Sequence, residues 1–177
     1  MPERPGFEIP PRAIPADDDG YFEQMTRAVF QAGFSWQVVN DKWPNFQKAF
    51  DGFDVEMIAR YGARKRRALL SDAGIVRNRL KIESTIGNAR AFLHVVDEYG
   101  SFSRYLWDFV DGKPIVNRWH TLADVPVSTE RSDALSKALK KRGFKFVGTT
   151  ICYSFMQAVG LVNDHTTDCF QIARAHV

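Results

Sequence analysis

Apolar residues recur at three- and four-residue steps along most of this chain, and no segment alternates apolar and polar residues as a half-buried strand does. The clearest stripe lies between about residues 78 and 98 and consists of Ile82, Ile86, Ala89, Leu93 and Val96. This spacing puts the apolar side chains on one face of a long helix. We therefore predict an all-α fold in which strands are at most minor.

Capping residues and glycine stops predict further helices. The first follows the acidic residues 17–19 and ends near Gln31 or Ala32, before Gly33. Ser35 is a plausible amino-cap for the second, which Pro44 must kink or split. The remaining predicted helices are short ones at about 55–61 and 64–70, one at about 130–142, and one that follows Gly148.

The chain is the size of one compact unit with an arm. At 177 residues, 45% hydrophobic and 13% aromatic, it has enough apolar surface to offset the entropy of ordering. Five of the eight prolines lie between Pro2 and Pro15, so residues 1–20 are expected to form an extended arm. Residues 21–177 are expected to form one helical domain.

Composition also indicates the cellular compartment in which the protein is expected. No apolar stretch approaches the roughly 20 residues that cross a bilayer, and the Pro-rich amino end lacks the apolar core of a signal peptide. Cys152 and Cys169 are too few for a disulfide framework. We expect a cytoplasmic protein without a membrane partner, acting as a monomer. The net charge of +3 does not by itself imply a polyanionic partner.

The most informative segment runs from Ser132 to Gly160 and has the pattern helix, hairpin, helix. A basic helix reaches Lys141 and Arg142, the chain breaks at residues 143–148, and a second helix begins at Thr149. We call residues 143–148 the hairpin. Its two flanking helices fix where the turn points.

The hairpin has the residues that a phosphate-binding turn needs. Gly143 and Gly148 permit backbone conformations closed to other residues, and Phe146 with Val147 is expected to anchor the turn in the core. Beyond Gly148 the first N–H groups of the next helix are free to approach a phosphate oxygen, helped by the helix dipole and by Lys145. From spacing alone, an ordinary helix–helix connection with two glycines is equally compatible. The predicted DNA-binding residues are Lys141, Arg142, Gly143, Lys145, Phe146, Gly148 and Thr149.

A family resemblance favours the phosphate-binding alternative. Residues 132–158 resemble the corresponding stretch of the DNA-3-methyladenine glycosylase I family almost residue for residue, and the likeness covers roughly residues 21–169. Shorter matches lie at 31–36, 72–75, 81–82, 87–91 and 160–165. The resemblance implies the helix-hairpin-helix glycosylase fold, which bends double-stranded DNA, flips out a damaged nucleotide and cleaves its N-glycosidic bond.

The resemblance also implies a base pocket, with one departure. Trp36 occupies the position of the family's stacking tryptophan, and an indole face attracts a cationic base. Gln31 and Ser154 fall on matched segments as polar contacts to base or sugar, with hydrogen bonding inside the protein as their alternative. Ala28 stands where the family has a glutamate that binds the methylated base. Glu23 is not a simple substitute, because it lies five residues earlier on a different part of the helix face.

A second departure concerns metal. The family's zinc site has four ligands, and His165 and Cys169 match its second pair, whereas the arm before Tyr21 contains neither Cys nor His. We therefore predict no bound metal and no cofactor. Asp164 follows the second helix, where a carboxylate either stabilises an oxocarbenium-like sugar or caps the last helix. We favour the capping role.

Three functions remain open on the sequence. The first is a base-excision-repair glycosylase that excises an alkylated purine. The second is a non-catalytic or altered-specificity DNA-binding and damage-recognition module, because Ala28 replaces the glutamate. The third is an all-α scaffold in which the hairpin is a relic.

Overall fold

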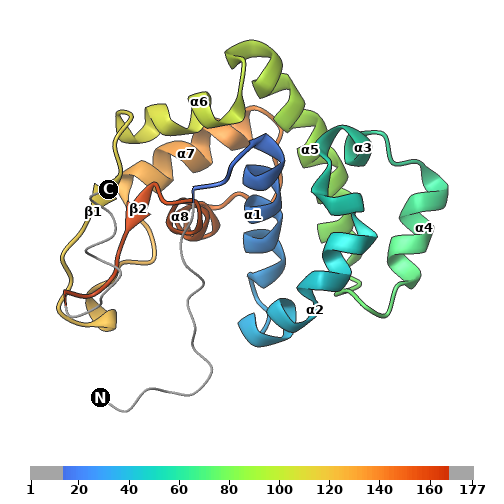
Figure 1. Cartoon of the computed structure of the whole chain (residues 1–177), viewed down its shortest axis with the longest axis horizontal. Coiled ribbons are helices and arrows are strands. Elements are labelled where there is room, and N and C mark those ends of the chain that lie inside the picture. The colour runs from blue at the N-terminus through green and yellow to red at the C-terminus, as the bar shows by residue number, and fades with distance from the viewer. Residues whose placement is uncertain (1–13, 168–177) are drawn as a thin grey trace.

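The structure is a computed structural model that describes residues 14–167, and in this range it is helical with one very small sheet (Figure 1). The helices are α1 (Asp18–Gln31), α2 (Trp36–Ala49), α3 (Val55–Ala59), α4 (Ala63–Ser71), α5 (Arg79–Tyr99), α6 (Phe102–Trp107), α7 (Glu130–Lys141) and α8 (Thr149–Ala158). Short 3-10 helices are η1 (Asp51–Phe53), η2 (Asp108–Val110) and η3 (Leu122–Asp124). Strands β1 (Ile115–Val116) and β2 (Val162–Asn163) pair in parallel. The all-α prediction is confirmed.

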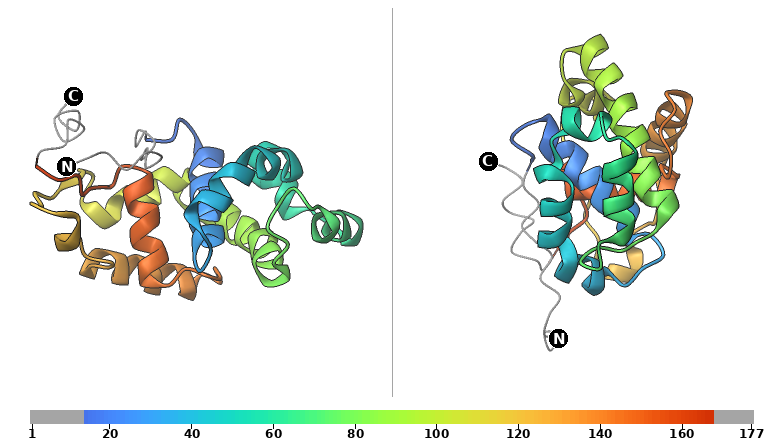
Figure 2. Two further views of the ribbon diagram at one scale, coloured as in Figure 1. Left: turned by 90° about the horizontal axis from the view of Figure 1, so that it is seen from below. Right: turned by 90° about the vertical axis from the view of Figure 1, so that its right-hand side faces the viewer.

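Helix α1 lies in the middle of the molecule, with α4 toward one end and the β1–β2 pair toward the other (Figures 1 and 2). It contacts α2 and α5 on one side and α6 and α8 on the other. Phe22 and Phe30 of α1 are fully buried, the first against Phe92 and the second against Phe46. Burying each such ring contributes about 1.5–3 kcal/mol, so these two rings hold α1 against α2 and α5.

The bounds of the first two helices agree with those predicted from the sequence, with two differences. Gly33 takes a φ of +76°, which ends α1 as predicted. Helix α1 begins at Asp18, inside the predicted arm; residues 1–13 of that arm lie outside the described residues. Pro44 lies within α2, which continues unbroken from Trp36 to Ala49, so the predicted split does not occur. Trp43 and Phe46 are buried beside the proline, and their packing holds the helix together.

Three consecutive aspartates at the start of α1 cap three different helices. Asp17 accepts a hydrogen bond from the N–H of Gly20 in α1 itself, at 2.9 Å. Asp18 accepts from Phe102 and Ser103 at the start of α6, at 3.1 and 3.3 Å. The third carboxylate, Asp19, accepts from the first N–H of α3 at 3.1 Å. Unpaired N–H groups at helix starts are thereby satisfied across the molecule.

Replacing Asp18 with alanine is expected to destabilise the protein by about 1–2 kcal/mol, because two N–H groups of α6 lose their acceptor and the helix dipole loses a nearby anion. Urea unfolding followed by circular dichroism measures the loss. Asp41→Ala is the matched control, since Asp41 is exposed and, within residues 14–167, its hydrogen bond is to Gln37 of its own helix. A change of less than about 0.5 kcal/mol in Asp18→Ala contradicts the capping role.

Candidate nucleic-acid interface and base pocket

The hairpin ends α7 sharply and opens the start of α8. Gly143 has a φ of +90°, and the N–H of Phe144 donates to the Leu139 carbonyl at 3.1 Å, which closes the helix. Gly148 has an ordinary φ of −59°, so it does not use the backbone freedom that glycine permits. What its missing side chain provides is space, because an added Cβ there meets no atom within 4 Å. The first turn of α8 is therefore open to a phosphate group.

Side chains from other helices hold the hairpin by its backbone. Asn88 of α5 donates from Nδ2 to the Lys145 carbonyl at 3.1 Å and accepts the Lys145 N–H at 2.8 Å, as a neighbouring strand would. Ser136 Oγ donates to the Val147 carbonyl at 2.6 Å, and the buried Cys152 thiol donates to the same oxygen at 3.3 Å. Burial raises the pKa of Cys152 to about 12, so this thiol stays protonated. The hairpin is thus fixed before any ligand arrives.

Of the two residues predicted to anchor the hairpin in the core, one is buried and the other is not. Phe144 and Val147 are buried, at 3% and 2% exposed, whereas Phe146 is 39% exposed. Phe146 has a φ of +56°, which turns its side chain outward between the two buried residues. Val147 confirms the prediction, and Phe144 takes the role that was assigned to Phe146.

Thr149 and Arg142, both predicted to contact phosphate, are already engaged within the protein. Thr149 Oγ1 donates to Asp133 at 2.6 Å and lies 2.7 Å from Ser132 Oγ, so its hydroxyl links α8 to α7. Its backbone N–H belongs to the open first turn of α8 and is the part that remains suited to a phosphate. The side chain of Arg142, at the end of α7, also has partners within the protein.

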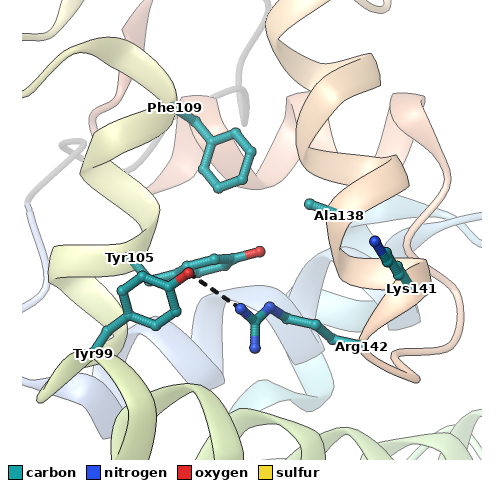
Figure 3. Close-up of a pocket in the computed structure, with 6 residues that line it drawn as sticks. All are labelled: Tyr99, Tyr105, Phe109, Ala138, Lys141 and Arg142. Carbon is teal, nitrogen blue, oxygen red and sulfur yellow. Dashed lines mark hydrogen bonds between the residues drawn. The ribbon is translucent and has the colours of Figure 1, made fainter.

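Arg142 fastens α7 to the end of α5 (Figure 3). Its guanidinium donates to both oxygens of Glu98, at 2.8 and 3.2 Å, and to the Tyr99 hydroxyl at 3.2 Å. It also lies over the rings of Tyr99 and Tyr105, at 5.3 and 5.0 Å. Arg142 and the two tyrosines line a cavity of about 470 Å³ together with Phe109, Ala138 and Lys141. Arg142 is thus engaged within the fold, whereas Lys141 and Lys145 are exposed, and their contact with phosphate stays a prediction.

The residues predicted for the base pocket come from α1, α2 and α8. Ala28 and Gln31 lie one turn apart on α1, Trp36 is the first residue of α2, and the exposed Ser154 lies on α8, which packs against α1. Gln31 Nε2 donates to Asn40 Oδ1 at 3.2 Å, so one end of its amide is held inside the protein. Ala28 is 7% exposed and belongs to the apolar core. Its position supplies a methyl surface where the family has a carboxylate.

Two nearby charged residues are also held within the protein. Glu23 Oε1 accepts from Trp43 Nε1 and Gln47 Nε2, both at 2.8 Å, which keeps this carboxylate against α2. Arg27 donates to Asn40 Oδ1 from Nε at 3.2 Å and from Nη2 at 2.5 Å. Burial lowers the pKa of Arg27. As expected from its place on the helix, Glu23 does not substitute for the missing glutamate.

Lys81, which lies in one of the short matched segments, fixes the turn between α1 and α2. Lys81 is 6% exposed, its Nζ donates to the Ala32 carbonyl at 2.5 Å, and the ammonium lies 4.9 Å from the centre of the Phe34 ring. Burial lowers its pKa. A cation at the carboxyl end of α1 also complements the helix dipole. Lysine is usually a surface residue, so only the packing of α5 reveals this role.

Asp164 is the centre of a buried hydrogen-bond network. It is 3% exposed and accepts from Asn117 at 2.7 Å, Trp119 at 2.8 Å, Gln157 at 2.7 Å and the Tyr153 hydroxyl. Burial by itself would raise the pKa of Asp164, but the hydrogen bonds outweigh it and the pKa is lowered. No helix within residues 14–167 begins at Asp164, so the predicted capping role is wrong for this range. With donors on both oxygens, the carboxylate is held within the fold.

Only half of the predicted residual metal site can be described. His165 is buried and its backbone N–H donates to Asn163 Oδ1 at 3.1 Å, while Cys169 lies outside the described residues. Within residues 14–167, no three His, Cys, Asp or Glu side chains gather as a metal site requires. The same range contains no helix long and apolar enough to span a membrane.

An all-α protein with two helices joined by a rigid, glycine-bounded hairpin and an open helix start belongs to the helix-hairpin-helix class of DNA-binding proteins. Comparison with known proteins gives the family within this class. A model of the methyladenine glycosylase family matches residues 13–172. This chain belongs to the methyladenine glycosylase family, as the resemblance predicted.

The individual similarities cover most of each chain. DNA-3-methyladenine glycosylase 1 of Escherichia coli K12 is 50% identical over 153 residues, which are 86% of this chain and 82% of the relative. A crystal structure of 3-methyladenine DNA glycosylase I superposes with a TM-score of 0.84 at 49% identity, covering 89% and 87% of the two chains. The Staphylococcus aureus enzyme, solved to explain 3-methyladenine recognition, gives 0.86 at 32% identity, covering 90% and 85%. The chain is therefore a homologue of base-excision-repair DNA glycosylases.

The Asp164 network gives a pH-dependent prediction. Asp164→Asn is expected to lower stability at pH 7 by roughly 1–3 kcal/mol, because four donors lose an ionised acceptor. A carboxylate whose pKa is lowered on folding stabilises the native state above its unfolded pKa of about 3.9, and this contribution is lost as the pH falls through the folded pKa. The gap between wild type and variant should therefore narrow below about pH 4 in urea titrations. A gap of constant size from pH 7 to pH 3 contradicts the assignment.

Proposed function

We propose that this protein binds double-stranded DNA through the hairpin, captures an extrahelical alkylated purine against Trp36 and hydrolyses its N-glycosidic bond. The observation that carries the proposal is the pre-formed hairpin, held by Asn88 and Ser136 with the start of α8 open beyond Gly148. Backbone N–H groups and lysines grip phosphate without reading sequence, as a search for rare lesions requires. We further propose that the protein acts as a monomer in the cytoplasm.

The proposed chemistry asks little of the protein. A 3-alkylated adenine is cationic, so it leaves the sugar without prior protonation, and the site needs only to hold the flipped nucleotide in place. Trp36 offers an indole face to that cation, and Gln31 and Ser154 offer polar contacts. Ala28 offers only apolar surface. Stacking and shape therefore carry base recognition in this protein.

Zinc has no role in this proposal. A structural zinc needs about four ligands, and the sequence provides His165 and Cys169 without the amino-terminal pair. The donor set does not fit the family's site. We propose that the protein binds no zinc, which a metal analysis of the purified protein after dialysis tests directly.

The decisive experiment is base release. Folded protein is incubated with methylated duplex DNA, and released bases are separated by chromatography; 3-methyladenine is the expected product. Trp36→Ala should lower the rate at least about tenfold while the melting temperature stays close to wild type, because one stacking face is lost. Trp107→Phe is the control, since Trp107 lies on α6 and bonds the Tyr21 hydroxyl, away from the pocket residues.

A second function follows from Ala28. If the folded protein binds methylated duplex DNA but releases no alkylpurine, the damage-recognition module is the correct assignment and the glycosylase proposal fails. Loss of both DNA binding and base release would favour the third hypothesis, an all-α scaffold. The three outcomes are thus separated by measuring binding and release on the same DNA.

Restoring the family's carboxylate is the complementary test. Ala28→Glu is expected to raise the rate of 3-methyladenine release, because a carboxylate favours a cationic, N–H-bearing purine edge. Ala28→Gln is the matched control, with the same reach and no charge. Equal rates in the wild type and both variants would show that position 28 does not face the base.

A further inference from the structure

Two phenylalanines in the described part of the chain have a positive φ, and they differ in what their rings do. Phe53 has a φ of +58° and Phe146 a φ of +56°. This region is unfavourable for a bulky side chain. Phe53 is fully buried, and its ring stacks on Trp43 with centroids 5.2 Å apart. Packing within the fold therefore offsets the strain at Phe53.

Phe146 has the same backbone strain, but burial of its ring does not offset it. It is 39% exposed, while its neighbours Phe144 and Val147 supply the buried anchors of the hairpin. Single exposed apolar residues are common on protein surfaces and need no explanation. The combination of exposure with a strained backbone does need one, since glycine or asparagine would occupy this position at lower cost.

The fold imposes this conformation from both sides. Asn88 holds the peptide groups of Lys145 through two hydrogen bonds, at 3.1 and 2.8 Å, and Ser136 holds the Val147 carbonyl at 2.6 Å. The backbone on either side of Phe146 is therefore pinned, and the ring is directed away from the core. A ring held outward by two separate helices is pre-organised for contact with a partner.

The surroundings of the ring indicate the partner's chemistry. Lys145 precedes it and is exposed, Lys141 ends α7, and the open first turn of α8 begins just beyond it at Gly148. A partner that satisfies this surface carries anionic groups with apolar surface between them. A DNA strand fits, because phosphates alternate with deoxyribose rings.

Building on the proposed function, we propose that Phe146 is a DNA-contact residue whose ring packs on the deoxyribose faces of the strand whose phosphate is held at the start of α8. The contact is apolar and independent of sequence. It adds affinity without adding charge. In this respect it differs from Lys145, which contributes through phosphate neutralisation.

The test is duplex binding by Phe146→Asn, measured by fluorescence anisotropy with undamaged DNA across a range of salt concentrations. Asparagine tolerates positive φ, so the hairpin keeps its shape while the ring is lost. The affinity should fall about tenfold with an unchanged salt slope, and the melting temperature should stay equal or rise. Lys145→Ala should instead reduce the slope by about one.

Two matched variants complete the design. Phe146→Tyr keeps the ring and should bind DNA as the wild type does. Leu122→Ala removes a more exposed apolar side chain from η3 and should leave binding unchanged. Wild-type affinity in Phe146→Asn would overturn the proposal, as would a lower melting temperature with binding recovered on cooling. The binding assay uses undamaged DNA, so its outcome does not depend on base release. Failure to release a base would contradict the glycosylase proposal but would leave the Phe146 proposal standing.

Discussion

The amino end of α1 is the constraint on which the two halves of the molecule depend. Asp17, Asp18 and Asp19 are consecutive, yet their carboxylates serve α1, α6 and α3. Helices that meet at their starts bring together N–H groups that no backbone acceptor satisfies, so charged side chains must do it. Because α6 and α3 belong to opposite halves, fixing both on α1 also fixes the orientation of the opposite end, where Gln31 and the turn to Trp36 lie.

Helix α5 plays the matching role for the parts proposed to face DNA. Lys81 holds the turn after α1 and Asn88 holds the hairpin, and these residues are seven positions apart on one helix. Seven residues are two turns and about 10 Å, so both side chains project from the same face. One rigid element thereby sets the spacing between the turn that carries Trp36 and the hairpin. A search enzyme gains from this arrangement, since neither loop has to be ordered when DNA binds.

Local patterns predicted the helices, the hairpin and its Gly143 stop because each depends on residues close in sequence. The errors arise where distant residues decide. Phe144 and Phe146 are equally apolar and two residues apart, and only the pinning of the hairpin by α5 and α7 determines which one is buried. The donors of Asp164 include Asn117 and Trp119, from a loop more than forty residues away. Pattern rules hold no information on such pairs.

The carboxylates near the proposed site bear on the range of bases that this protein releases. Asp164 accepts four hydrogen bonds and its pKa is lowered, so it is not a proton donor at neutral pH. Glu23 is held against α2 by its hydrogen bonds from Trp43 and Gln47. A neutral purine needs protonation to leave, and Asp164 cannot supply it. A cationic alkylpurine needs none. With Ala28 in place of the glutamate, the proposed glycosylase is therefore expected to select through the leaving ability of the base as much as through contacts to it.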